Sequence, residues 1–494
     1  MPKKKQRRRK SEAQYSSLAS HKKAGKSFLP PMLSLPTPLK LQSWLNDRLP
    51  EMLWAALLLT HLGRAKGLEV FRRVAYYGGD KLRNFDKPLD VRLTDMAAWP
   101  NDWRRELLGI LTTGAEPKRA LRPLLLFEDL PAKADWREAI AVEPVPEKDW
   151  LSLAKAVAST LDHQSQEATD CRWARLVFQV TLGRVHFHSS MREQAEEILF
   201  YPDRGDQRAV RPSIRSAELG LETGQDNSMP RVWPNKFWAQ CLRDTGCRPI
   251  SPGSEPEEDS ITPEYIRDLY EAVRSWSERT RSTTAVDPRH EAIVGAALFA
   301  IGVLAEIKFL RAERSILGRF GLRTLLEVQV TLAYLLKAED MELWRSYRVF
   351  GAGQAKLQFL HLERLGGAPT FVDINILESL ANEDQWQEFL KIEVGHWAKL
   401  SLRDLSIKTD LKDDYDMIYP WTSTYVHGHW GAIRDSVFGV CLNPLHRLHR
   451  VPLGVPRLLD PVLKEATELV EKIVRLAQTG FPDEPIFLGL QEEE

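Results

Sequence analysis

The chain has 494 residues, of which 43% are hydrophobic and 28% are charged. These ordinary values exclude a largely disordered or fibrous protein. Because single hydrophobic cores stop growing near about 250 to 300 residues, the length predicts two to three domains. Lysine plus arginine equals aspartate plus glutamate, so the formal net charge is zero.

The balanced charge hides a basic N-terminus, because the first 26 residues carry a net charge of +9. Such a block repels itself and has few apolar residues to bury, so together with the proline-rich stretch that follows it predicts a disordered arm over residues 1–40. The arm could bind RNA or DNA non-specifically, or it could only keep the chain soluble. A nuclear import signal would look similar. The predicted nucleic-acid contacts are Lys3, Lys4, Lys5, Arg7, Arg8, Arg9 and Lys10.

The four cysteines, Cys171, Cys241, Cys247 and Cys441, are too few and too scattered for a disulfide framework, so we expect a cytoplasmic protein. Cys241 and Cys247 lack the close spacing and second pair of a typical zinc site, and no metal or cofactor is predicted. The basic start lacks an apolar signal segment. The longest uncharged apolar run, 292–305, is shorter than the roughly 17 to 25 residues that cross a bilayer, so no membrane span is expected.

The N-terminal half reads as a mostly helical domain over residues 41–249. Apolar residues recur at helical spacing from Trp44 to Arg64, and further helices are expected at 65–76, 101–112, 147–162 and 191–200. The stretch 171–185 is dense in Val, Phe and Leu, and it fits either short strands or a buried helix.

An acidic linker is predicted at 250–262, followed by a C-terminal multi-helix bundle over 263–480 and a tail over 481–494. Thr262 and Pro263 provide an N-cap and a first-turn proline. The expected helices are 263–281, 288–315, 317–338, 340–362, 373–381, 383–397, 421–438 and 457–478. Gly295 and Gly302 lie on one face of the second, where a neighbouring helix could approach closely. The fold class is therefore mainly α.

No Walker loop, dinucleotide-binding glycine motif, zinc-protease motif, nucleophile elbow or kinase motif set is present. The first candidate for chemistry is Arg323 with Glu327, which share a helix face at i,i+4 spacing near apolar positions. A buried ion pair of this kind either organises helices or takes part in a site. Both interpretations stay open.

The second candidate is the stretch 413–434, which is rich in Tyr, Ser, Asp and His. On a helix, Ser423 and His427 share one face, while Tyr425 lies on another with Trp421 and His429. An imidazole can act as a general base on a neighbouring hydroxyl, or the stretch can be aromatic packing with hydrogen-bonded histidines. The predicted catalytic residues are Arg323, Glu327, Tyr425 and His427.

Residues of about 265–440 resemble a helical bacterial family of unknown function, in which an Arg-x-x-x-Glu helix precedes a Tyr/Ser/His-rich segment. The matching positions are Arg323, Glu327, Arg345, Tyr347, Tyr425 and His427. The resemblance implies a helical bundle and a setting among phage-defence genes. The architecture also resembles HEPN ribonucleases, but none of the 12 histidines follows an arginine at their Arg-x4-6-His spacing. That departure argues against nuclease activity of the usual kind.

The leading prediction is a cytoplasmic bacterial defence or stress-response protein that acts on a protein partner through helical interaction surfaces and could carry a buried polar site. One alternative is a ribonuclease that uses the basic arm and the four predicted catalytic residues. The other alternative is a purely structural subunit. Whether the chain is an enzyme at all stays open.

Overall fold

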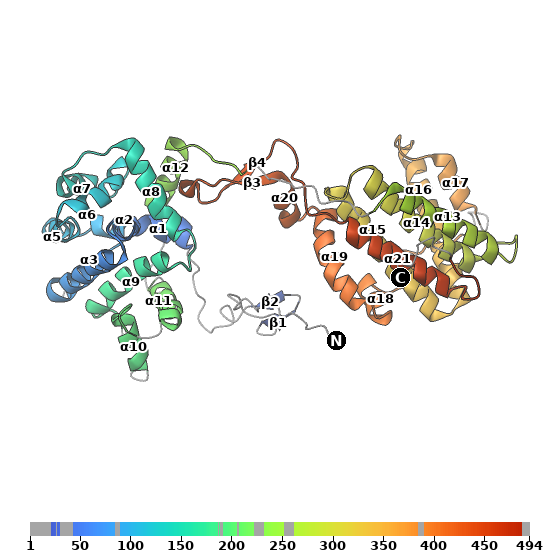
Figure 1. Ribbon diagram of the computed structural model, residues 1–494, viewed down its shortest axis with the longest axis horizontal. Helices are drawn as coiled ribbons and strands as arrows, with labels where there is room; N and C mark the ends of the chain where they lie inside the picture. Colours follow the sequence, from blue (N-terminus) through green and yellow to red (C-terminus); the bar gives the residue numbers. More distant parts are fainter. Residues whose placement is uncertain are drawn as a thin grey trace, which may run out of the picture. The chain divides into compact units, whose positions relative to one another are not determined.

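Figure 1 shows the computed structural model, which describes residues 21–25, 27–29, 43–83, 89–185, 187, 191–204, 207–221, 232–250, 261–383 and 390–486. These residues are mostly helical, which confirms the predicted mainly α fold class. The chain forms two compact units. Unit 1 comprises Met1–Ile250 and Val440–Arg450, and unit 2 comprises Ser251–Gly439 and Val451–Glu494.

The division between the units begins where the linker 250–262 was expected, although residues 251–260 lie outside the described part of the chain. The C-terminal unit differs from the expected 263–480, because 440–450 belong to unit 1. The basic residues expected to bind nucleic acid, Lys3 to Lys10, also lie outside the described residues. Within the predicted arm, β1 (Lys22–Ala24) and β2 (Ser27–Leu29) pair antiparallel.

Unit 1 is a packed set of short helices around α2 (Leu53–Leu62). All side chains from Leu53 to Leu59 are buried, because α3, α6, α8 and α9 pack around this helix. The other elements are η3 (Trp44–Arg48), α1 (Leu49–Glu51), α3 (Arg64–Tyr77), η4 (Gly78–Leu82), α4 (Leu93–Ala97), α5 (Asn101–Leu111), α6 (Ala115–Leu121), η5 (Arg122–Leu126), α7 (Lys133–Ile140), α8 (Pro146–Thr160), α9 (Gln166–Thr181), α10 (Arg192–Leu199), α11 (Gln207–Gly220) and α12 (Val232–Asp244).

The stretch 171–185, which fitted either strands or a helix, lies largely in α9. This helix is buried on all sides from Ala168 to Gln179, so its charged residues must be neutralised inside the core. Arg175 Nε donates to Asp90 Oδ2 at 2.8 Å, and its Nη1 donates to Glu218 Oε1 at 2.7 Å. Arg48 also pairs with Glu218. These ion pairs join η3, α9 and α11.

Residues 440–450 complete the core of unit 1 although they follow most of unit 2 in sequence. The 3-10 turn η8 (Pro444–His446) packs against α8 and α12, and Leu445 is only 2% exposed. The guanidinium of Arg447 lies 5.1 Å from the ring centroid of Trp238. The chain passes into this segment through β3 (Phe438–Val440) and leaves it through β4 (Arg450–Pro452), and the two strands pair.

Unit 2 is a helical bundle whose central helix is α14 (Pro288–Phe309), packed against α13, α15, α16 and α21. By length and composition alone, α14 is the one helix in the described part of the chain that could cross a membrane. Ile293, Ala297 and Ile301 on it are fully buried in the bundle. The remaining helices are α13 (Pro263–Thr280), α15 (Ile316–Ala338), α16 (Met341–Leu365), α17 (Ile374–Ala381), α18 (Leu402–Lys408), α19 (Lys412–Val426), α20 (Trp430–Val437) and α21 (Leu463–Thr479).

The structure confirms the predicted start of α13, where the Thr262 hydroxyl accepts a hydrogen bond from Tyr265 N at 3.3 Å. Two helix predictions were wrong. The described part of 383–397 from residue 390 onward is not helical. The predicted helix 421–438 is divided between α19 and α20, because Gly428 adopts a left-handed conformation (φ 58°) that ends a helix.

Candidate functional site

A polar cluster in unit 2 is built around the guanidinium of Arg323, which projects from α15 toward α19. Its Nε donates to Glu327 Oε1 at 2.8 Å, and its Nη2 donates to the Tyr419 hydroxyl at 3.0 Å. Its Nη1 faces Ser423 Oγ at 3.3 Å and His427 Nε2 at 3.5 Å. We call Arg323, Glu327, Tyr419, Ser423 and His427 the Arg323 cluster. One arginine therefore joins two side chains of α19 and the His427 that caps it to one carboxylate of its own helix.

The cluster has a buried centre and an exposed edge. The side chain of Arg323 is 15% exposed and that of Glu327 is 42% exposed. His427 follows the last residue of α19 and is exposed, as is His429 beyond the Gly428 turn. The two imidazole rings lie 5.7 Å apart between centroids, with an angle of 30° between their planes. Two imidazoles and one guanidinium thus meet at a surface that a polar ligand can reach.

Glu327 connects the cluster to a cavity of about 360 Å³ between α14, α15 and α16. Ala292, Gly295 and Ala296 form its small-residue lining on α14, and Thr324 and Glu327 supply polar groups from α15. The expectation that Gly295 and Gly302 admit a neighbouring helix was wrong, since a Cβ at either position would meet no atom within 4 Å. At Gly295 the missing side chain leaves space in this cavity.

The predicted set of catalytic residues is only partly assembled. Arg323, Glu327 and His427 come together as expected, but Tyr425 does not join them. Its hydroxyl donates to Asp435 Oδ2 at 3.1 Å, and Arg319 lies 5.8 Å from its ring centroid. Burial, with a further effect of the Asp435 carboxylate, raises the pKa of Tyr425. The phenol that contacts Arg323 is Tyr419 instead.

Two further positions on which the resemblance rested lie outside the cluster. Tyr347 lines the cavity beside Glu327 and packs its ring 5.1 Å from that of Trp397. Arg345 is exposed and pairs with Glu342 on its own helix.

Burial lowers the pKa of His396, and the nearby Glu327 carboxylate acts in the opposite direction.

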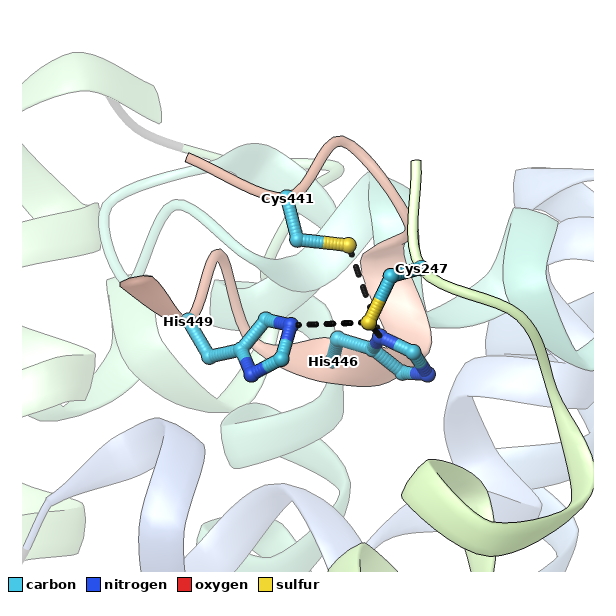
Figure 2. Close-up of side chains that lie close together, drawn as sticks. All are labelled: Cys247, Cys441, His446 and His449. Carbon is cyan, nitrogen blue, oxygen red and sulfur yellow. Dashed lines mark hydrogen bonds between the residues drawn. The ribbon is translucent and has the colours of Figure 1, made fainter. Parts of the chain in front are cut away.

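Sequence reasoning missed a second group of chemistry-bearing side chains, which lies in unit 1. Cys247, Cys441, His446 and His449 place one potential ligand atom each within 4.8 Å of all the others (Figure 2). Cys247 has no second ligand pair near it in sequence, because its three partners lie in 440–450. The spacing of Cys441, His446 and His449 was the signal that could have directed attention there.

Residues 319–441 match DUF5677, a family of unknown function. The match covers about a quarter of the chain and includes every member of the Arg323 cluster. It leaves out α14, which forms one wall of the cavity, and three of the four Cys and His residues just described. No curated protein and no solved structure matches the chain.

Proposed function

We propose that unit 2 is a metal-independent ribonuclease in which Arg323 and His427 act on a phosphodiester bond of RNA. The observation that carries the proposal is the 3.5 Å approach of Arg323 Nη1 to His427 Nε2 at the exposed end of α19. HEPN ribonucleases, which the architecture resembles, carry an arginine and a histidine close together in sequence; in this chain α15 and α19 bring Arg323 and His427 close together in space, which supports the proposal. A guanidinium offsets charge on phosphate oxygens, and an imidazole transfers protons near neutral pH.

The side chains present suffice for transphosphorylation. His427 takes the proton from a ribose 2′ hydroxyl, and the 2′ oxygen attacks phosphorus as the bond between phosphorus and the 5′ oxygen breaks. His429 gives a proton to the departing 5′ oxygen, so the products are a 2′,3′-cyclic phosphate and a 5′ hydroxyl. The long contacts of Arg323 Nη1, 3.3 Å to Ser423 and 3.5 Å to His427, can be exchanged for a phosphate oxygen.

The adjoining cavity fits this substrate. Its volume of about 360 Å³ is in the range of small-ligand pockets, and an unpaired base needs such a space beside the reacting phosphate. Glu327 accepts hydrogen bonds, so it would bind an exocyclic amino group of a base. The proposal therefore favours single-stranded RNA over duplex RNA.

The direct test is cleavage of an end-labelled single-stranded RNA by the full chain without added magnesium. We expect cyclic-phosphate products, and no cleavage of the same sequence carrying 2′-deoxyriboses. His427→Asn removes the base and should lower the rate about 10²- to 10⁴-fold. His361→Asn, at an exposed histidine of α16, is the matched control and should leave the rate unchanged. Failure to cleave RNA, or equal rates for His427→Asn and the unmodified chain, overturns the proposal.

The process that such cleavage would serve remains a prediction. The resemblance implies phage defence or a stress response, and the matching experiment is a phage challenge of cells that express either the unmodified chain or His427→Asn. If the proposal is right, protection depends on His427 and not on His361.

A second candidate is action through a protein partner, and exposed apolar residues around α17 favour it. Phe371 is 86% exposed, and Ile376 and Leu380, four residues apart on α17, are 59% and 43% exposed. Exposed apolar groups that share a face commonly mark interaction sites. A photo-reactive residue at position 376 should cross-link to one defined protein in cells. The same residue at position 351, on the exposed side of α16, should not.

A further inference from the structure

Three sulfur-to-nitrogen separations among the four side chains of Figure 2 match those of a tetrahedral metal site, and all four ligand atoms lie within 4.8 Å of one another. Cys247 Sγ lies 3.5 Å from His446 Nδ1 and 3.4 Å from His449 Nε2, and Cys441 Sγ lies 3.4 Å from His446 Nδ1. Zinc binds thiolate at about 2.3 Å and imidazole at about 2.0 to 2.1 Å, so tetrahedral geometry puts sulfur and nitrogen ligands about 3.6 Å apart. The observed separations agree with that value.

Neighbouring groups hold these ligands in the orientation that metal binding needs. His446 turns Nδ1 toward the two sulfur atoms, while its Nε2 lies 2.9 Å from Thr245 Oγ1. The Thr245 hydroxyl donates to Cys241 O at 2.6 Å, so it accepts the Nε2 proton of His446 and leaves Nδ1 free to bind metal. Hydrogen bonds of this kind set the tautomer of metal-binding histidines.

The backbone supports the two cysteines. Arg248 N donates to Cys441 Sγ at 3.2 Å, which is the contact expected for a thiolate. Leu442 N donates to Arg248 O at 2.7 Å, and Cys441 N donates to His449 O at 3.0 Å. The segment after α12 and the segment 440–450 are therefore fixed side by side, with all four side chains directed to one point.

We propose that unit 1 binds one Zn²⁺ through Cys247, Cys441, His446 and His449, and that the ion fastens residues 440–450 to the end of α12. Two thiolates and two imidazoles in a tetrahedral arrangement favour zinc over harder cations. Four protein ligands leave no open coordination position, so the ion is structural. On binding, each thiol that carries a proton releases it to solvent.

The test begins with elemental analysis of the full chain, purified in a non-thiol reductant. We expect about one zinc per chain. Replacing zinc with Co²⁺ should produce the visible absorption of tetrahedral cobalt together with thiolate-to-metal charge transfer. Chelation should lower the melting temperature of the unmodified chain, and added zinc should restore it.

Variants assign the ligands. Cys247→Ala and His449→Ala change the two more accessible ligands, and each should lose the bound zinc. In the cobalt form, each should lose or shift the charge-transfer band. The matched controls Cys171→Ala and His361→Ala should keep both the metal content and the spectrum. Thr245→Val leaves all four ligands in place but should weaken zinc affinity about 10- to 100-fold, because the hydrogen bond that orients His446 is lost.

The proposal is overturned by a chain that contains no zinc and gains none on titration, by a cobalt spectrum without thiolate bands, or by metal content unaffected by Cys247→Ala. A count of reactive thiols on the denatured chain, without a reducing agent, tests whether Cys247 and Cys441 instead form a disulfide bond. All four cysteines should react, whereas a bond between Cys247 and Cys441 would leave two reactive thiols and would also overturn it.

Discussion

Arg323 and His427 are 104 residues apart in sequence, and their side chains approach to 3.5 Å. The contact is possible because α15 and α19 pack along each other, so that one long side chain on α15 spans the width of the interface. Tyr419, Ser423 and His427 follow each other at intervals of four residues on the facing side of α19.

The two tyrosines of α19 should behave differently. Tyr419→Phe removes the hydroxyl that accepts from Arg323 Nη2 at 3.0 Å, and a hydrogen bond to a charged group contributes about 1.5 to 3 kcal/mol. We therefore expect RNA cleavage to fall about 10- to 100-fold. Tyr425→Phe removes a hydroxyl that contacts Asp435 and Arg319, neither of which belongs to the Arg323 cluster, and it should leave cleavage unchanged. Rate measurements on both variants check this, and a larger effect of Tyr425→Phe would contradict the geometry.

The buried ion pairs of unit 1 should be sensitive to loss of one charge. Glu218→Gln leaves Arg48 and Arg175 inside the core without their shared carboxylate, and breaking a buried pair costs about 3 to 5 kcal/mol. Glu116→Gln, the matched control, removes an exposed pair with Lys66 and should cost far less, because solvent screens exposed charges. Urea unfolding followed by tryptophan fluorescence compares them. Similar costs for the two variants would count against a buried network.

Two helical glycines should respond to alanine with opposite signs. A Cβ at Gly318, in the first turn of α15, would come far closer than 3.0 Å to the carbonyl oxygen of Ala312, so Gly318→Ala must displace backbone and should destabilise unit 2. Gly351, in the middle of α16, has no such neighbour. Gly351→Ala should therefore stabilise the chain by roughly 0.5 to 1 kcal/mol through helix propensity. Thermal unfolding of both variants tests the signs.

Glu51 should make stability depend on pH. Burial raises its pKa from 4.5 to about 7, against the opposing hydrogen bonds from Thr94. Both states hold the proton below pH 4.5. As pH rises toward 7 the unfolded state releases it first, so the free energy of unfolding falls across that window.

Glu51→Gln keeps the group neutral and removes this effect. The variant should match the unmodified chain near pH 4 and exceed its stability by about 1 to 3 kcal/mol at pH 8, given that one pKa unit corresponds to about 1.4 kcal/mol. Urea unfolding at both pH values is the measurement. A variant that is less stable than the unmodified chain at pH 8 would show that folding favours the ionised carboxylate, and therefore that the pKa of Glu51 is not raised.

Features that depend on local spacing could be predicted from the sequence. The start of α13 follows from Thr262 and Pro263, whose side chains act within one turn. Arg323 and Glu327 form the expected i,i+4 pair, and Ser423 and His427 share the expected face. Each of these relationships needs only the helical repeat.

The helical periodicity alone could not show that Tyr419, and not Tyr425, contacts Arg323. The predicted helix began at residue 421 and so left Tyr419 out, whereas α19 begins at Lys412 and carries Tyr419 on the face toward α15. The Cys and His group was beyond local reasoning for a related cause. Cys247 lies near its partners only because the chain returns from unit 2 to unit 1 at residues 440–450. No sequence pattern near Cys247 predicts that return.

The place of residues 440–450 in unit 1 has a consequence for synthesis on the ribosome. His449 is made 202 residues after Cys247, which at about 5 to 20 residues per second means a delay of about 10 to 40 seconds. During that time Leu445, which is buried against α8 and α12 in the complete protein, has not been synthesised. The surfaces of α8 and α12 that it covers are therefore exposed. The nascent N-terminal half therefore emerges incomplete and presents apolar surface to chaperones until translation is nearly finished.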